Sequence, residues 1–190
     1  LPIIIDDRQE FQTIDGFGFA LTEGSAFHLH HMSDSAREQI LKEMFGTEGN
    51  HVGFSYIRLT LGASDLNNFV YSYNDLPDGK KDLEMKKFDL GYDYDDIIPV
   101  MKEILKIVPD IKIMASPWSA PAWMKESKNV RGGALKNECY DAYARYFTKY
   151  VQAMAKEGIN IDVVTVQNEP LNSRNTPSMP WFWQPQNEFV

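Results

Sequence analysis

A carboxylate and an amide stand at the end of an apolar run near the C-terminal end of the sequence. Residues 163–166 are Val-Val-Thr-Val, a β-branched pattern typical of a strand that is buried on both faces, and Asn168 and Glu169 follow shortly after it. Pro170 then ends the run, because proline cannot donate a backbone hydrogen bond. A carboxylate at such a strand end is suited to proton transfer in catalysis, although the same residue type often caps a helix or simply faces solvent.

Other polar and aromatic residues lie at or after the ends of three earlier apolar runs. Thr22 and Glu23 follow the first run, Arg58 lies in the second, and Ser116 and Trp118 follow the third. In parallel α/β folds the carboxyl ends of the strands share one edge, so residues far apart in the sequence converge there. We therefore expect an active-site mouth that includes these side chains. Arg58 also has a structural alternative, an ion pair with a buried carboxylate.

Tryptophans are concentrated in the proline-rich segments that follow the later strands. The four are Trp118, Trp123, Trp181 and Trp183. Flat, rigid rings in such loops suit the apolar faces of sugar rings, so we expect all four to bind substrate. The alternative is that they only pack the loops against one another.

Several other patterns point away from metal or cofactor chemistry. Residues 28–31, His-Leu-His-His, have no carboxylate nearby at ligand spacing, so no metal site is expected. Residues 15–20, DGFGFA, lack the third glycine and the helix start of a dinucleotide fingerprint. Ser25, Ser116 and Ser119 have no histidine placed to form a catalytic triad. No cofactor is therefore expected.

Composition and net charge limit the kinds of molecule that the protein is expected to bind. The 190 residues are 43% hydrophobic and 24% charged, which is typical of a globular protein with a substantial core. The net charge of -8 disfavours nucleic acid or an anionic membrane surface, and a neutral substrate fits better. Cys139 is the only cysteine, so no internal disulfide forms. No apolar run is long enough for stable membrane insertion.

Hydrophobic periodicity predicts alternating strands and helices. We expect strands at residues 3–5, 11–21, 55–62 and 111–118 and from residue 163, and helices at 33–45, 95–108 and 137–157. Ser33 is the expected cap of the first helix, and Gly46 ends it. Residues 63–93 and 171–187 are predicted loops, and residues 186–190 are compatible with the start of a further helix.

Four strand–helix units of this kind indicate a parallel sheet with helical crossovers. A doubly wound sheet and half of an eight-stranded barrel both fit the pattern. Periodicity alone does not choose between the two architectures.

Four segments of the chain together resemble glycoside hydrolase family 30, which includes lysosomal-type glucosylceramidases, β-1,6-glucanases and β-xylosidases. The segments are QTIDGFGFALTE, YIRLTLGASD, IMASPWSAPAWMK and TVQNEP, in this order. The likeness covers nearly the whole chain, and SPWSAPAWMK together with NEP is specific to the family. The resemblance implies a (β/α)8 TIM barrel with a β-sandwich beside it. Residues 1–13 would then be a strand segment of the sandwich, and residues 14–190 the first four βα units of the barrel.

The resemblance also implies roles for individual residues. Glu169 matches the general acid/base, and Asn168 matches the residue that hydrogen-bonds the sugar 2-hydroxyl. Trp118 and Arg58 match positions that line the glycone subsite, where the arginine would hold the nucleophile ionised. Glu23 falls where lysosomal-type members carry an aspartate that grips sugar hydroxyls. Its longer side chain departs from that pattern and leaves the glycone and linkage open.

The implied activity is that of a retaining β-glycoside hydrolase acting by double displacement. Such enzymes need two carboxyl groups about 5 to 5.5 Å apart, and the family's nucleophilic glutamate would lie beyond residue 190, so we expect the 190 residues alone to be inactive. Glu169 must hold its proton near neutral pH for the first step, which requires burial and an anionic neighbour.

A β-1,6-glucan is the favoured substrate, because the polar loops lack a stripe of large aliphatic residues for acyl chains. A glucosylceramidase or a β-xylosidase of the same family is the alternative, and a non-catalytic glycan-binding relative is the alternative from another class. The sequence begins LPIII, which is compatible with a mature end left after signal-peptide removal. A secreted, periplasmic or cell-surface location is therefore expected.

Overall fold

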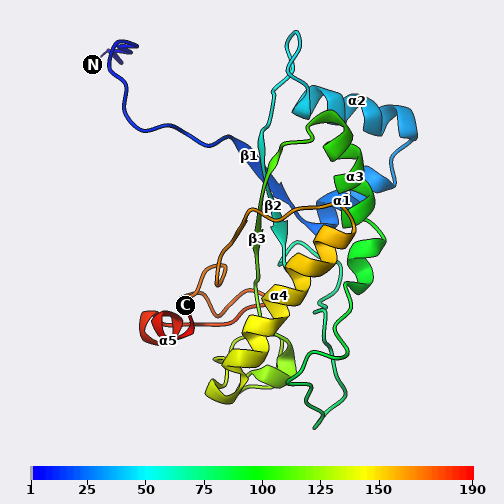
Figure 1. Cartoon of the computed structure of the whole chain (residues 1–190), viewed down its shortest axis with the longest axis vertical. Coiled ribbons are helices and arrows are strands. Elements are labelled where there is room, and N and C mark those ends of the chain that lie inside the picture. Colours follow the sequence, from blue (N-terminus) through cyan, green and yellow to red (C-terminus); the bar gives the residue numbers. More distant parts are fainter. Residues whose placement is uncertain (1) are drawn as a thin grey trace.

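The computed structural model describes residues 2–190 and is built on a four-stranded parallel sheet (Figure 1). The strands are β1 (Gly18–Leu21), β2 (Tyr56–Thr60), β3 (Lys112–Ser116) and β4 (Val163–Val164), and they lie side by side in the order of the sequence. β1 and β2 approach closely at Gly18, where a Cβ atom would lie 1.4 Å from the carbonyl oxygen of Tyr56. Only glycine fits at that position.

Helices occupy every crossover between the strands, and one further helix follows β4. They are α1 (Glu23–His30), α2 (Asp34–Phe45), α3 (Ile97–Ile107), α4 (Tyr140–Lys156) and α5 (Trp183–Phe189), with short 3-10 turns at Gly91–Tyr94, Ala122–Met124 and Asn137–Cys139. The first four helices gather along one side of the sheet (Figure 1). Sequential strand order with helices on one side is the arrangement of a barrel wall, whereas a doubly wound sheet has helices on both faces.

Local capping explains where the first two helices begin. The Ser33 hydroxyl accepts a hydrogen bond from the amide of Ala36 at the start of α2, as predicted. Thr22 does the same for Ser25 at the start of α1. The sequence analysis missed α1, because its eight residues bury only Glu23, Ala26 and Leu29 and show no apolar stripe.

The core lies between the sheet and the helices. Its largest fully buried side chains include Tyr73, Tyr143, Tyr146, Tyr150, Phe45, Ile57 and Leu59. One face of α4 packs into this core: Tyr146 and Tyr150 are buried, whereas Ala144 is exposed. Tyr150 stacks on Tyr73 with ring centroids 5.5 Å apart, so α4 is fixed to the loop after β2.

Three strand predictions need correction, those at residues 3–5, at residues 11–21 and from residue 163. β1 covers only residues 18–21, and residues 2–17 form no strand and run away from the sheet (Figure 1). The assignment of residues 1–13 to a β-sandwich stays a prediction. β4 has two residues, and Val163 and Val164 are 42% and 41% exposed rather than buried on both faces. The reason is that β4 pairs with β3 alone and forms the sheet edge in the described residues.

Candidate active site

Arg58 joins three strands at the carboxyl edge of the sheet. Its Nη2 atom donates to the hydroxyl of Ser116, at the end of β3, and to Oδ1 of Asn168, just after β4, each at 2.8 Å. The Ser116 hydroxyl lies 2.6 Å from that of Thr165. The parallel register places these residues at successive strand ends, so one guanidinium reaches both neighbours.

Trp118 lies against the guanidinium of Arg58. The Arg58 Cζ atom is 4.8 Å from the centre of the indole ring, which is the geometry of a cation–π contact. The indole Nε1 donates to Oδ1 of Asp65 at 3.1 Å. Trp118 is therefore held at both its face and its edge.

Asp65 connects this tryptophan to the loop that carries Glu169. The Nδ2 atom of Asn175 donates to Asp65 Oδ2 at 3.0 Å and to Glu169 Oε2 at 2.8 Å. Asn172 Nδ2 donates to the same oxygen of Glu169 at 3.0 Å. Asp65, Asn172 and Asn175 were not predictable as site residues, because each lies in a predicted loop without a local signal.

The backbone at Glu169 is held in an uncommon conformation. Its φ angle is +44°, in the left-handed region that non-glycine residues rarely adopt and that tends to occur at functional sites. The amide of Asn168 donates to the carbonyl of Pro117 at 2.8 Å, and Gln167 Nε2 donates to the carbonyl of Trp118 at 2.8 Å. These bonds tie the segment after β4 to the segment after β3.

The electrostatics of the cluster couple its arginine to its carboxylate. Burial lowers the pKa of Arg58, and the negative charge of Glu169 offsets part of that effect. The guanidinium stays charged, since arginine does not lose its proton in proteins. Glu169 itself is exposed, contrary to the expected burial, because it follows the edge strand β4. The environment expected for an acid catalyst is therefore absent from the described residues.

Glu23 does not join this cluster. It is the first residue of α1, is only 3% exposed, and lines a different pocket together with His30 and Asp96. Burial, and then the charge of Asp96, raise the pKa of Glu23. The family resemblance implied a position that contacts sugar hydroxyls, but the chain begins α1 at Glu23 and directs the side chain elsewhere.

The four tryptophans separate into different environments. Trp118 alone contacts Arg58, whereas Trp123 is 8% exposed and donates its Nε1 to the carbonyl of Asn74 at 2.9 Å. Trp181 is 1% exposed, and its ring is covered by protein. Trp118 is also only 7% exposed within residues 2–190, so burial does not separate these rings, and the expectation that Trp123 and Trp181 bind substrate stays a prediction. Trp183, in α5, is 73% exposed and keeps a free ring.

A buried lysine fastens the two loops that carry the cluster. Lys125 Nζ donates to the hydroxyl of Ser119 at 2.8 Å, to the carbonyl of Val130 at 3.0 Å and to the carbonyl of Ser178 at 2.8 Å. Burial lowers the pKa of Lys125 to about 7. Ser119 gives its own proton to the carbonyl of Ala120, so its oxygen is an acceptor toward the lysine, while the carbonyl of Val130 also accepts from the amide of Ser178 at 3.0 Å.

Sequential parallel strands, helices along one side and polar residues at the carboxyl strand ends define a protein of the βα-barrel class, whose chemistry lies at that edge. Residues 14–179 match the Glycosyl hydrolase family 30 TIM-barrel domain, and the chain belongs to that family. The architecture and the family expected from the sequence are confirmed.

Relatives of two kinds are similar to the chain. An endo-1,6-beta-D-glucanase of Neurospora crassa is 38% identical over 168 residues, which cover 86% of this chain and 34% of that protein. The lysosomal acid glucosylceramidase of Mus musculus is 32% identical over 90% of this chain and 33% of that protein. The solved structure of the endo-beta1,6-glucanase BT3312 has a TM-score of 0.89 and 39% identity over 97% of this chain and 41% of that one. The chain thus spans about a third of the length of these curated relatives.

Proposed function

We propose that the natural protein is a retaining β-glycoside hydrolase in which Glu169 is the general acid/base. The observation that carries the proposal is the position of Glu169 at the carboxyl end of β4, directly after the amide that Arg58 holds. Family membership supports the same reaction class. The second carboxyl group that the reaction needs is expected from a part of the natural protein outside these 190 residues.

In the proposed reaction, Glu169 gives its proton to the glycosidic oxygen while the second carboxylate attacks the anomeric carbon. Glu169 then takes a proton from water, which releases the sugar with retained configuration. Asn172 and Asn175 donate to Oε2, so they fix the orientation of the carboxyl group and leave Oε1 for the substrate. Trp118 and Arg58 form the adjoining wall.

We further propose a β-linked glucosyl substrate, with β-1,6-glucan favoured over a glucosyl lipid or a β-xyloside. The names of similar proteins support this choice, since several are endo-1,6-beta-D-glucanases. The net charge of -8 suits a neutral glycan. Within residues 2–190, no helix is long and apolar enough to cross a membrane. Because a polysaccharide does not enter cells intact, the proposal includes a secreted, periplasmic or cell-surface location.

Proton NMR of the first products from a β-1,6-glucan tests the proposal with the natural full-length protein. We expect the β-anomer to appear first, and we expect Glu169→Gln to stop hydrolysis of the glucan. On an aryl β-glucoside with a good leaving group, the same variant should still release the aryl alcohol in a first burst, because that step needs no acid. The matched control is Glu126→Gln, an exposed glutamate in the loop after β3.

Three outcomes contradict the proposal in different ways. Full activity of Glu169→Gln on the glucan would remove the acid/base role. The α-anomer appearing first would exclude retention. Binding of the glucan without any hydrolysis of glucan, glucosyl lipid or β-xyloside would indicate a non-catalytic glycan-binding protein.

A further inference from the structure

A pocket lies apart from the cluster around Glu169, beside helices α1 and α3. Its volume is about 450 Å³, which is in the range of small-molecule sites. Its walls include the carboxylates of Glu23, Asp95 and Asp96 and the rings of Phe27, Phe69 and Tyr92. None of its lining residues is a lysine or an arginine. The pocket is therefore acidic and aromatic, with no cation of this type to balance it.

Glu23 contributes a buried negative charge to this pocket. The residue is 3% exposed, and its Oε2 atom is buried with no hydrogen-bond partner among residues 2–190. Burial, followed by repulsion from Asp96, raises the pKa of Glu23, and the amide of Asn68 and the imidazole of His28 offset only part of this. A buried carboxylate oxygen without a partner is costly, so a positive charge in the pocket would be strongly favoured.

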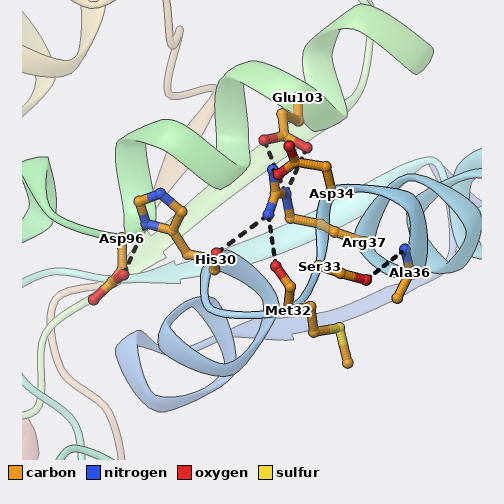
Figure 2. Close-up of polar contacts among 8 residues, drawn as sticks. All are labelled: His30, Met32, Ser33, Asp34, Ala36, Arg37, Asp96 and Glu103. Atoms are coloured by element: carbon orange, nitrogen blue, oxygen red, sulfur yellow. Dashed lines mark hydrogen bonds and ion pairs between the residues drawn. The ribbon is translucent and has the colours of Figure 1, made fainter.

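The neighbouring wall is rigid. The His30 imidazole lies 2.9 Å from the Asp96 carboxylate (Figure 2). Arg37 holds the turn after α1 in place: its Nη1 atom donates to the carbonyls of His30 and Met32, while its Nε atom contacts both oxygens of Glu103 on α3 (Figure 2). The Asp96 carboxylate is thus fixed near Glu23 rather than free to turn away into solvent.

Aromatic rings form the open side of the pocket. Phe69 and Tyr92 are 43% and 49% exposed, and their rings meet edge to face with centroids 4.5 Å apart. Phe27 packs on His31 with centroids 4.1 Å apart. The faces of such rings attract cations, most strongly where water is partly excluded. Carboxylates inside and rings at the rim favour an organic cation that has both a charge and an apolar body.

The side chains do not have the arrangement of a metal site. Within residues 2–190 no three His, Cys, Asp or Glu side chains converge as ligands around one ion. We propose that this pocket binds a small organic cation, with a primary ammonium or guanidinium group at Glu23 and Asp96 and a short carbon chain against Phe69 and Tyr92. This binding is separate from the proposed glycosidase reaction.

Calorimetric titration of the natural full-length protein with n-butylammonium chloride tests the proposal, with n-butanol as the neutral probe of the same shape. Both are measured at one pH and one ionic strength. We expect saturable binding of butylammonium at one site per chain and at least about tenfold weaker binding of butanol. The affinity for butylammonium should fall by about tenfold or more in Glu23→Gln and by a few-fold in Asp95→Asn. Equal binding of the two probes would overturn the proposal.

Two features keep the test decisive. Asp95 is exposed, so Asp95→Asn does not depend on how well the Glu23 variant folds, and unchanged affinity in that variant would also overturn the proposal. Asp141→Asn, on the exposed face of α4, removes the same charge elsewhere. If it weakened binding as much as Asp95→Asn, the attraction would be general and the site rejected. Glucan hydrolysis by Asp95→Asn should stay unchanged, so this proposal and the glycosidase proposal can fail separately.

Discussion

Arg58 Nη2 donates a hydrogen bond to Oδ1 of Asn168 at 2.8 Å, although the two residues are 110 positions apart in the sequence. A guanidinium only donates, so the contact fixes which end of the Asn168 amide faces the arginine. The Nδ2 end is then directed away from Arg58 and is free to donate to a substrate hydroxyl. The bond thus sets the chemistry that the amide offers beside Glu169.

Arg58→Lys tests this arrangement. Lysine keeps the charge but cannot lie flat on Trp118 while it donates to both Ser116 and Asn168. We expect kcat/KM for glucan hydrolysis by the natural protein to fall on the order of a hundredfold. The free energy of unfolding should change by no more than about 2 kcal/mol. A lysine variant with normal kcat/KM would show that the charge alone is sufficient.

Trp118→Phe separates the two contacts of the indole. Phenylalanine keeps an aromatic face for Arg58 but loses the 3.1 Å bond from Nε1 to Asp65. Since Asp65 also holds Asn175, which contacts Glu169, we expect kcat to fall by about tenfold. The measurement is the steady-state kcat of Trp118→Phe, compared with that of Trp118→Ala and of the natural protein. The alanine variant should lose clearly more, and equal losses would place all of the effect in the hydrogen bond from Nε1 to Asp65.

Lys125→Met tests the connection between the loops after β3 and β4. The substitution keeps an unbranched chain but takes the lysine donor from the buried carbonyl of Ser178 and from the carbonyl of Val130, which keeps the amide of Ser178. We expect the free energy of unfolding to fall by about 2 to 4 kcal/mol, measured by urea denaturation. The control is Lys136→Met, which removes a single 2.8 Å bond to the carbonyl of Trp123 and should cost about 1 kcal/mol. Similar losses in both variants would contradict the special role of Lys125.

Asp93 gives the stability a defined pH dependence. Burial raises the pKa of its carboxyl group from 3.8 to about 7, while the hydroxyls of Tyr71 and Tyr73, each 2.6 Å away, partly oppose the shift. Because the folded pKa is the higher one, the contribution of this group is complete below about pH 4 and is lost as the pH rises through about 7. Asp93→Asn removes the titration and preserves the shape.

Urea denaturation at pH 5 and pH 8 measures this effect. The natural protein should lose about 2 kcal/mol more than Asp93→Asn between the two pH values. The free energy of unfolding of Asp93→Asn should still fall somewhat with rising pH, because the pKa of Glu23 is also raised. Asp141→Asn, at an exposed position, should behave like the natural protein. An identical slope in Asp93→Asn would assign the pH dependence to other groups.

Local features of the fold were predictable from the sequence. Ser33 was identified as a helix cap and Gly46 as the end of the same helix, because capping depends on residue type within one turn. The helices at 97–107 and 140–156 followed from apolar spacing. α1 did not, since the polar Glu23 and the small Ala26 fill its buried positions and give no stripe.

The sequence by itself determined the four strands of the sheet, three of the helices, the family, and the place of Asn168 and Glu169 shortly after the fourth strand, because motif and periodicity are properties of neighbouring residues. Only the tertiary structure decided which side chains meet. It brought Asp65 and Asn175 to Glu169, buried Trp123 in the core and turned Glu23 into a separate pocket. The physical reason is that burial and hydrogen bonding across 50 or more residues depend on strand register and helix direction, which local spacing does not specify.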